Sequence, residues 1–366
     1  MPKVLFLTPL PPPIHGMSYL NNLLLKSLDT RFDFVTVKLN KSDAINNVGR
    51  FSLIKLKYFF DIRHQIRAHL KATSFDLIYF AVATSGFGLY RDLLLLLSIK
   101  RNTKSNLILH VRGRDFTDHK RNPLVKLLLK KTFSGTYVIQ HSEKLRQDID
   151  WFGATYKKRY YLPNGIPVAS STQGNSKRES TCVNLLYLSM KFRDKGIYEL
   201  LEALIILRKN NVNFRLDFIG DYVSLDEEKN IKRIINENNL NNCINDQPAT
   251  FGKEKDLCYR NADIFVFPTR IESFGNVILE AMSHVVPVIA TNEGSIPEIL
   301  DNGNAGVLCQ KENPADLAKK LIDLVGSEEK RKEIGEKGYR RFLSMYTFSH
   351  FENNLSAIFN DVINSK

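Results

Sequence analysis

Short apolar runs rich in β-branched and aromatic residues alternate with longer segments of helical periodicity along most of this chain. Such alternation is typical of an α/β protein whose parallel strands are joined by helices. Segments such as 20–28 place leucines at helical spacing between these runs. In the first half, runs of four to six residues predict strands at Lys3–Thr8, Phe34–Lys38, Leu77–Ala81, Leu107–Val111 and Tyr137–Gln140.

The alternation is interrupted once, near the middle of the chain. Residues 161–168 (YLPNGIPV) contain two prolines and an Asn-Gly pair, and residues 170–181 are polar, so together they predict a linker. The pattern then resumes. The expected strands are Leu185–Leu188, Phe214–Ile219, Ile264–Phe267 and Val286–Ala290, and the expected helices are Ile197–Lys209, 226–238 and Pro314–Val325.

This pattern predicts two Rossmann-like domains joined by one linker. We place the first domain at residues 1–165 and the second at 166–346, and we expect a C-terminal helix over 347–366 to pack back on the first. The chain, at 366 residues, is too long for one ordinary domain and long enough for two. Such a pair of domains leaves a cleft between them, where ligands usually bind.

Positive charge is concentrated in the first half of the chain. Residues 1–168 contain 27 Lys and Arg against 11 Asp and Glu, whereas residues 169–366 contain 25 against 28. A basic half suits nucleic acid, an anionic membrane surface or a phosphorylated acceptor, or it is only a solvated surface that favours solubility. No apolar run approaches the ~20 residues that span a bilayer. The four cysteines lack metal-ligand spacing, so we expect a cytoplasmic protein without a structural metal.

The most specific motif begins where the expected strand Ile264–Phe267 ends, because a proline, a loop and a helix starting near Gly275 follow it. The first N–H groups of a helix lack internal partners and carry the positive end of its dipole. They therefore suit a diphosphate, and glycine allows its close approach. Glu272 in the loop and Glu280 along the helix can accept hydrogen bonds from sugar hydroxyls. The alternative is that both glutamates are ordinary charges flanking a helix.

The segment 262–299, ADIFVFPTRIESFGNVILEAMSHVVPVIATNEGSIPEI, resembles the signature of glycosyltransferase family 4, a retaining family of group 1 type. The resemblance implies the GT-B fold, an α/β architecture of two Rossmann-like domains facing an interdomain cleft. It also implies metal-independent transfer from a UDP- or GDP-linked sugar, without a cofactor. In the family's pattern Glu272 contacts the donor sugar and Glu280 the ribose. The donor-binding stretch would be Phe274, Gly275, Asn276 and Val277, with the last three amides holding the diphosphate.

A second motif, SMKFRDKG at 189–196, lies between an expected strand and an amphipathic helix. A lysine at such a turn offers a point charge to a pyrophosphate, and Lys195 matches the lysine with which the family neutralises the leaving nucleoside diphosphate. The family arginine falls on Met190, which is a departure. Lys191 or Arg193 is expected to replace its charge. The alternative for Lys195 is an ordinary solvated loop residue.

The first half holds weaker candidates. Gly16 follows His15 and a proline run after the first strand, where the family uses a glycine-rich turn to contact donor phosphate and acceptor. His110 ends the fourth expected strand, and family members place a histidine there, near the transferred sugar. Arg112 and Arg114 follow it and are candidates for an anionic acceptor. Either the histidine is catalytic, with Glu272 and Lys195, or it is only a satisfied residue at a strand end.

Two basic amphipathic segments, 51–72 and 124–133, suit docking on anionic lipid. In the first, Phe51, Ile54, Phe59, Ile62 and Ile66 lie among Lys55, Lys57, Arg63, Arg67 and Lys71. The alternative is that these apolar faces belong to the core. If they dock, the protein is peripheral on the inner face of the cytoplasmic membrane. Its acceptor would then be polyprenyl-diphosphate-linked or an oligosaccharide, in bacterial surface polysaccharide assembly such as capsule or lipopolysaccharide.

Two competing functions remain open at the level of the sequence. A nucleotide-sugar 2-epimerase has a related fold, but it should lack the paired glutamates and need no basic acceptor domain. A non-catalytic protein that binds membrane or nucleic acid would explain the charge and leave Glu272, Lys195 and Glu280 without a purpose. We therefore expect an enzyme that does not act on nucleic acid. Asp148 and Asp150 form a D-x-D pair, which we interpret as part of a surface helix and not as a metal site.

Overall fold

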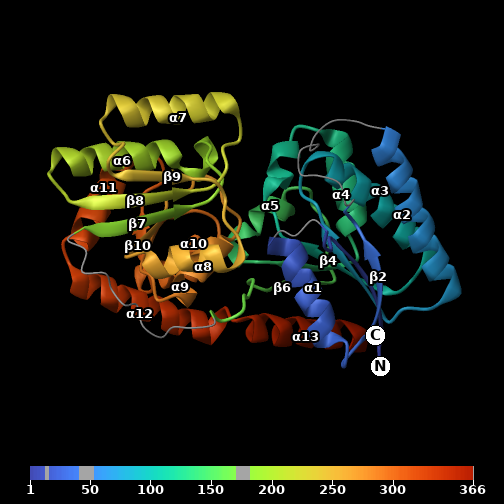
Figure 1. The fold of residues 1–366 in the computed structure, drawn as a ribbon. Coiled ribbons are helices and arrows are strands. Elements are labelled where there is room, and N and C mark those ends of the chain that lie inside the picture. The colour runs from blue at the N-terminus through green and yellow to red at the C-terminus, as the bar shows by residue number, and fades with distance from the viewer. Residues whose placement is uncertain (13–15, 41–52, 170–181, 366) are drawn as a thin grey trace. The chain divides into compact units, whose positions relative to one another are not determined.

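The computed structural model describes residues 1–12, 16–40, 53–169 and 182–365. The contacts divide the chain into two compact units. Unit 1 comprises Met1–Pro163 and Ser349–Lys366, and unit 2 comprises Asn164–Phe348. Each unit is a parallel sheet covered by helices, and the colours of Figure 1 show that the red C-terminal helix returns to the blue N-terminal unit.

The sheet of unit 1 has six parallel strands in the order β2-β1-β3-β4-β5-β6. The strand order reverses between β1 and β3, which makes the carboxyl ends of these strands the switch point where open α/β sheets usually bind ligands. The strands are β1 (Lys3–Thr8), β2 (Asp33–Lys38), β3 (Leu77–Val82), β4 (Asn106–Val111), β5 (Tyr137–Gln140) and β6 (Lys158–Tyr161).

Helices cover both faces of this sheet because alternate strand residues point to opposite sides. Leu5 and Leu7 belong to a core that includes α2, α3 and α4. On the other face Phe6 stacks on Tyr79, with ring centroids 4.5 Å apart, and Tyr79 contacts Phe359 of α13. The helices are α1 (Gly16–Leu28), α2 (Leu53–Ala72), α3 (Gly86–Asn102), α4 (Pro123–Phe133), α5 (Gln147–Asp150) and α13 (Phe348–Asn364), with short 3-10 turns η2 (Asp115–His119) and η3 (Glu143–Leu145).

Unit 2 repeats this plan with a parallel sheet in the order β12-β11-β10-β7-β8-β9, so its switch point lies between β7 and β10. The strands are β7 (Val183–Leu188), β8 (Phe214–Ile219), β9 (Ile244–Gln247), β10 (Ile264–Phe267), β11 (Val288–Thr291) and β12 (Val307–Cys309). The helices are α6 (Ile197–Lys209), α7 (Leu225–Glu237), α8 (Gly252–Asn261), α9 (Asn276–Ser283), α10 (Ile296–Ile299), α11 (Pro314–Val325) and α12 (Glu328–Met345), with 3-10 turns η4 (Arg193–Lys195) and η5 (Asp301–Gly303).

The predicted α/β class with parallel sheets is confirmed, and six predicted elements have the observed bounds: β1, β5, β8, β10, α6 and α11. The prediction missed β6, β9 and β12. All three are edge strands, and β6 (KRYY) and β9 (INDQ) are too polar to show an apolar run. Edge strands pair on one side only and often carry charge, so they give the weakest sequence signal.

The chain enters and leaves unit 2 at one place. The Ile166 amide donates to the Tyr346 carbonyl at 3.0 Å, and the Phe348 amide donates to the Ile166 carbonyl at 2.7 Å. A parallel bridge joins Ile166 to Thr347. The residues just after the chain enters unit 2 are therefore hydrogen-bonded to the residues just before it leaves. Within the described residues, none of the helices has the length and apolar character needed to cross a membrane.

Candidate functional site

Two loops meet at the switch point of unit 2: residues 189–196 after β7 and residues 268–275 after β10. Gly196 has φ 73°, and a Cβ there would lie 1.8 Å from the Pro268 carbonyl oxygen, so only glycine permits this contact. The Arg270 amide donates to the Asp194 carbonyl at 2.8 Å, and the buried Tyr187 hydroxyl donates to the Met190 carbonyl at 3.0 Å. The two loops thus form one hydrogen-bonded structure above the sheet.

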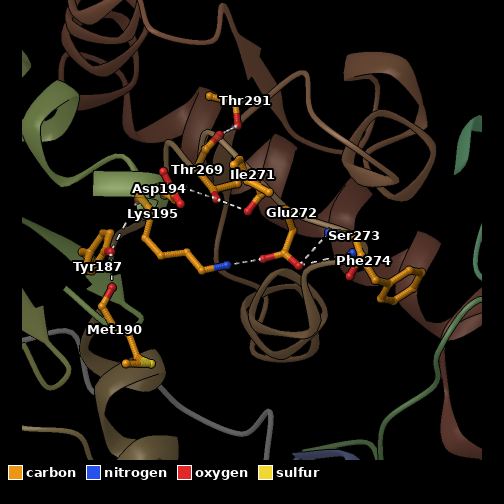
Figure 2. Close-up of polar contacts among 10 residues, drawn as sticks. All are labelled: Tyr187, Met190, Asp194, Lys195, Thr269, Ile271, Glu272, Ser273, Phe274 and Thr291. Atoms are coloured by element: carbon orange, nitrogen blue, oxygen red, sulfur yellow. Dashed lines mark hydrogen bonds and ion pairs between the residues drawn. The ribbon is translucent and has the colours of Figure 1, made fainter. Parts of the chain in front are cut away.

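The ends of these loops bring Lys195 and Glu272 together, as Figure 2 shows. The Lys195 Nζ donates to one Glu272 carboxylate oxygen at 2.9 Å, and the side chains are only 21% and 16% exposed. The other carboxylate oxygen accepts from the amides of Ser273 and Phe274, at 3.0 and 3.3 Å. Each oxygen therefore has a defined donor. The pair is fixed in place although part of it still faces solvent.

Gly275, the residue before α9, has a left-handed conformation with φ 93° and ψ 61°, which few other residues adopt without strain. The loop before it is clamped from behind, because a Cβ at Gly294 would lie 2.1 Å from the Glu272 carbonyl and Ser295 Oγ donates to the Ser273 carbonyl at 2.7 Å. Asn276, the first helical residue, accepts from the Asn164 side chain at 2.9 Å. The helix start predicted at Gly275 is therefore correct, and its position is rigidly determined.

Glu280 lies one turn further along α9 and has two partners from α8. Lys255 Nζ lies 2.6 Å from one carboxylate oxygen, and the Tyr259 hydroxyl donates to the same oxygen at 2.7 Å. Burial raises the pKa of Tyr259 well above its usual value, so the phenol remains a hydrogen-bond donor. The predicted pair of Glu272 and Glu280 thus consists of two carboxylates that each accept from one lysine. Glu280 is held in place by residues that the motif did not include.

The residues expected to replace the family arginine behave differently from one another. Met190 is half exposed. Lys191 is fully buried, and its Nζ donates to Asp246 at 2.5 Å and to the Gln247 carbonyl at 2.7 Å. The expectation that Lys191 could serve the diphosphate is therefore wrong, since its charge is already used within the fold. Arg193 is exposed, with its guanidinium 5.7 Å from the Tyr198 ring centre, and it remains the candidate.

Unit 1 contributes a buried polar group at the carboxyl end of β4. His110 has no exposed surface, and its Nδ1 lies 2.6 Å from the Tyr79 hydroxyl. Burial, with a smaller effect of the Arg112 charge, holds the pKa of His110 well below its usual value. The neighbouring His141 has its pKa lowered to about 3, also mainly by burial. Both imidazoles are therefore neutral near pH 7.

The hydrogen bonds around Tyr79 determine which ring nitrogen of His110 carries the proton. Arg112 Nη2 donates to the Tyr79 hydroxyl at 3.2 Å, and a guanidinium has no acceptor. The phenol proton is thus left for His110 Nδ1, which makes Nε2 the protonated ring nitrogen. That Nε2 is buried and has no protein partner among the described residues. A neutral histidine with an unused N–H donor suits a hydroxyl of a bound ligand.

Of the other predicted residues of unit 1, Arg112 contacts this group through the Tyr79 hydroxyl. Gly16 is the first residue of α1, whereas His15 lies outside the described residues. The Arg112 guanidinium also lies 5.8 Å from the Phe351 ring centre. Arg114 is the residue immediately before η2. Three further residues of these sites were not predicted: Tyr79, Lys255 and Tyr259. Lys255 and Tyr259 could have been found from their i,i+4 spacing on α8, the helix that precedes β10.

The D-x-D pair is divided between two environments. Asp150 is exposed and pairs with Arg146 at 2.8 Å, as a surface helix predicts. Asp148 is buried instead, and its carboxylate accepts from the Thr117 amide at 3.2 Å. Burial raises the pKa of Asp148 to about 7. Across the described ranges, no group of three or more His, Cys, Asp or Glu side chains has a metal-binding arrangement.

Comparison with known proteins identifies the family. Residues 174–341, nearly all of unit 2, match the family model described as glycosyl transferases group 1. The capsular polysaccharide biosynthesis glycosyltransferase CapM of Staphylococcus aureus is 28% identical over 251 residues, which is 62% of each chain. An uncharacterized glycosyltransferase of Methanocaldococcus jannaschii is 26% identical over 342 residues, or 89% of each chain. The match thus spans less than two thirds of the first relative and most of the second.

Solved structures agree with the fold along the whole length. Sucrose-phosphate synthase from Thermosynechococcus elongatus superposes with a TM-score of 0.76 at 15% identity, covering 100% of both chains. Anabaena HepE in complex with UDP and glucose gives 0.74 at 16% identity, covering 98% of this chain and 100% of that one. Such identities establish the architecture alone. Unit 2 therefore belongs to the group 1 glycosyl transferases, and the chain as a whole has the GT-B fold.

Proposed function

We propose that this protein is a retaining, metal-independent glycosyltransferase that moves a sugar from a UDP- or GDP-linked donor to an acceptor hydroxyl. The Lys195–Glu272 pair at the switch point of unit 2 carries the proposal. One lysine, one carboxylate and the start of α9 lie together where an open α/β sheet binds its ligand. These groups suit the sugar and the diphosphate of a nucleotide sugar. They also suit the negative charge that develops when the diphosphate leaves.

Each residue then has one role. Lys195, with Arg193, stabilises the negative charge that accumulates on the leaving diphosphate, together with the amides of Gly275, Asn276 and Val277 beside Phe274. Glu272 accepts hydrogen bonds from the donor sugar, and Glu280 accepts them from the ribose. His110 offers its Nε2 proton to a sugar hydroxyl. Gly16 allows donor and acceptor to approach the backbone of unit 1.

Retention requires that the acceptor attack from the face that the diphosphate leaves. We assign no enzyme nucleophile, because Glu272 is already bound by Lys195 and by two amides. In this scheme the departing diphosphate accepts the proton of the acceptor hydroxyl while the new glycosidic bond forms. Catalysis then consists of positioning and electrostatic stabilisation, without a metal ion or a cofactor.

We further propose that the acceptor is polyprenyl-diphosphate-linked or an oligosaccharide, in the assembly of a bacterial surface polysaccharide such as capsule or lipopolysaccharide. The name of the Staphylococcus aureus relative supports this pathway. The charge of residues 1–168, with 27 Lys and Arg against 11 Asp and Glu, supports an anionic acceptor and a site of action at the inner face of the cytoplasmic membrane. Arg112, Arg114 and His15 are the acceptor-side candidates.

The first experiment is a thermal-shift screen over UDP-, GDP- and ADP-sugars, because a ligand that binds only the folded state raises the melting temperature. We expect one nucleotide to give a clear shift, and transfer from its sugar to persist in EDTA. NMR of the product should show the anomeric configuration of the donor. A strict requirement for Mg²⁺ or Mn²⁺ would contradict the metal-free scheme, and an inverted product would contradict retention.

A further inference from the structure

Two neighbouring helices of unit 1 expose large apolar side chains. On α3, Tyr90 is 43% and Leu94 is 49% exposed, and on α4, Leu124 is 63% and Leu127 is 61% exposed. The spacings are i,i+4 on α3 and i,i+3 on α4, so each pair lies along one side of its helix. Figure 1 shows α3 and α4 as neighbours on the same side of the unit 1 sheet.

These side chains are not needed for the core, because the opposite sides of both helices already supply it. Leu89, Leu93 and Leu96 of α3 are buried, as are Val125 and Leu129 of α4. A surface helix of a globular protein usually has one apolar stripe and a polar remainder. Here α3 and α4 each have a second apolar stripe, which faces solvent. Exposed apolar patches of this kind usually mark a contact surface.

Basic residues surround the exposed leucines of α4. Residues 119–133 contain five Lys or Arg and no Asp or Glu, and these five side chains are exposed: Lys120, Arg121, Lys126, Lys130 and Lys131. The Tyr90 ring lies 6.2 Å from the His119 ring. Apolar and basic side chains are therefore interspersed along α4, and the Tyr90–His119 contact joins the start of α3 to this basic segment.

We propose that this α3–α4 face, formed by Tyr90, Leu94, Leu124, Leu127 and the five basic residues of 119–133, docks on an anionic lipid bilayer. Aliphatic and aromatic side chains enter the boundary between headgroups and acyl chains, while Lys and Arg contact anionic headgroups. A self-complementary dimer through this face would bring its five cations against the same five of a second copy. Nucleic acid would use the cations but would leave the leucines exposed.

The face differs from the one that the sequence indicated on the segment 51–72. Ile62 and Ile66 of α2 have 1% and 2% exposure and belong to the core, so their expected role in lipid contact is wrong. Phe51 lies outside the described residues. The segment 124–133 does contribute, through the side of α4 that the core does not use. The proposed docking depends on the proposed function only for its biological purpose, since lipid binding is measurable without sugar transfer.

The test is co-sedimentation of the full chain with vesicles of phosphatidylglycerol and phosphatidylcholine, or of phosphatidylcholine alone, at low and high salt. We expect binding to the anionic vesicles only, weakening steeply with salt. The double substitution Leu124→Ser with Leu127→Ser should weaken binding at least tenfold, because two apolar side chains no longer enter the bilayer. The triple substitution Lys126→Gln, Lys130→Gln and Lys131→Gln should weaken it on the order of a hundredfold at low salt.

Matched controls lie on unit 2. Leu343→Ser with Met345→Ser removes two exposed apolar side chains from α12, and Lys319→Gln, Lys332→Gln and Lys337→Gln remove the same net charge as the α4 triple. Both controls should bind as the native protein does. Circular dichroism melting of every variant separates lost binding from lost folding, because substitutions at exposed positions change stability little.

Three results would overturn the proposal. Vesicle binding that is absent at low salt, or unchanged in the Leu124→Ser and Leu127→Ser variant, would remove the lipid contact. Concentration-dependent dimers abolished by that variant, without vesicle binding, would identify the face as an interface between copies. Salt-sensitive binding to RNA without vesicle binding would make it a nucleic-acid surface. Absent sugar transfer with intact vesicle binding would count against the proposed function alone.

Discussion

The two units hold their functional polar groups in opposite ways. In unit 2 they are charged, partly exposed and paired: Lys195 with Glu272, and Lys255 with Glu280. In unit 1 the two histidines at the carboxyl ends of β4 and β5 are buried and uncharged near pH 7, since burial lowers the pKa of His110 and lowers that of His141 to about 3. The same sheet architecture thus supports two kinds of site. One pairs charged side chains with each other, and the other contains a buried, neutral hydrogen-bond donor.

The difference follows from how each unit builds its loops. Left-handed glycines at Gly196 and Gly294 let the loops of unit 2 pack backbone against backbone, and Lys195 and Glu272 lie on these loops beyond the strand ends. His110 instead belongs to strand β4 itself and lies beneath the surface. A phosphate of fixed charge suits the first arrangement, and a neutral sugar hydroxyl suits the second. The comparison can be tested on each side.

The largest effect is expected from removing the charge of Lys195. Lys195→Met keeps the length of the side chain but not its charge, so transfer should slow about 10²- to 10³-fold, as for other lost stabilisers of transition-state charge. Arg193→Met is the comparison on the same loop and should cost less. In a double-mutant cycle with Glu272→Gln, a strong coupling would show that the two residues act as a pair. Nearly full activity of Lys195→Met would show that the charged site of unit 2 does not depend on this lysine.

Glu280→Ala should weaken nucleotide binding by about 1.5–3 kcal/mol, because a charged acceptor for ribose hydroxyls is lost. Turnover at saturating donor should change much less, which separates Glu280 from Glu272. Tyr259→Phe should have a smaller effect in the same direction, since Lys255 still holds the carboxylate. Isothermal titration with the nucleoside diphosphate measures both. Unchanged affinity in Glu280→Ala would remove this residue from the site.

The buried acid of unit 1 predicts a pH-dependent stability. Asp148 has a folded pKa of about 7 against an ordinary value of 3.8, so the folded state favours the protonated form. Its stabilisation is complete below pH 4 and is lost as the pH rises toward 7. Asp148→Asn should therefore be more stable than the native protein at pH 8, by at least about 2 kcal/mol, with the difference vanishing near pH 4. Urea unfolding at both pH values measures it.

A control for this prediction is Asp150→Asn, in the same helix. Burial acts to raise the pKa of Asp150, but the hydrogen bonds and charges of Arg159 and Arg146 together lower it below its usual value. Its substitution should destabilise slightly at pH 8 or leave stability unchanged, since exposed ion pairs contribute little. If Asp148→Asn behaved like Asp150→Asn, the carboxylate of Asp148 would be ionised in the folded protein, and the contrast between the two units would be weaker.

The smallest effect concerns the proton on His110. Tyr79→Phe removes the donor to Nδ1, so ¹⁵N NMR of the imidazole should change from a pure Nε2–H form to a mixture. Transfer should slow only several-fold, because both the histidine and the donor site remain. Phe6→Leu, which alters the ring stacked on Tyr79, is the packing control and should keep the Nε2–H form. An Nδ1–H imidazole in the native protein would contradict the assigned hydrogen-bond order.

The parts of this fold that could be predicted are those with a local signal. Buried strands such as β1 and β10 are continuous apolar runs, and the start of α9 is indicated by Gly275 after Phe274. Contacts between distant residues leave no such signal. From the sequence, Lys191 is a loop lysine that could serve the diphosphate, and only the fold reveals Asp246 beside it. The Tyr79–His110 contact likewise joins two strands 31 residues apart.

The return of α13 to unit 1 has a consequence for synthesis of the chain. Phe359 packs against Phe32 and Tyr79, so one helical layer of the N-terminal unit is made of residues that the ribosome adds after all of unit 2. Unit 2 is continuous from Asn164 to Phe348 and can fold while the end of the chain is still being translated. The usual order, in which the N-terminal domain is completed first, is reversed here. A nascent chain stalled before α13 should therefore contain a protease-resistant second unit and a protease-sensitive first one.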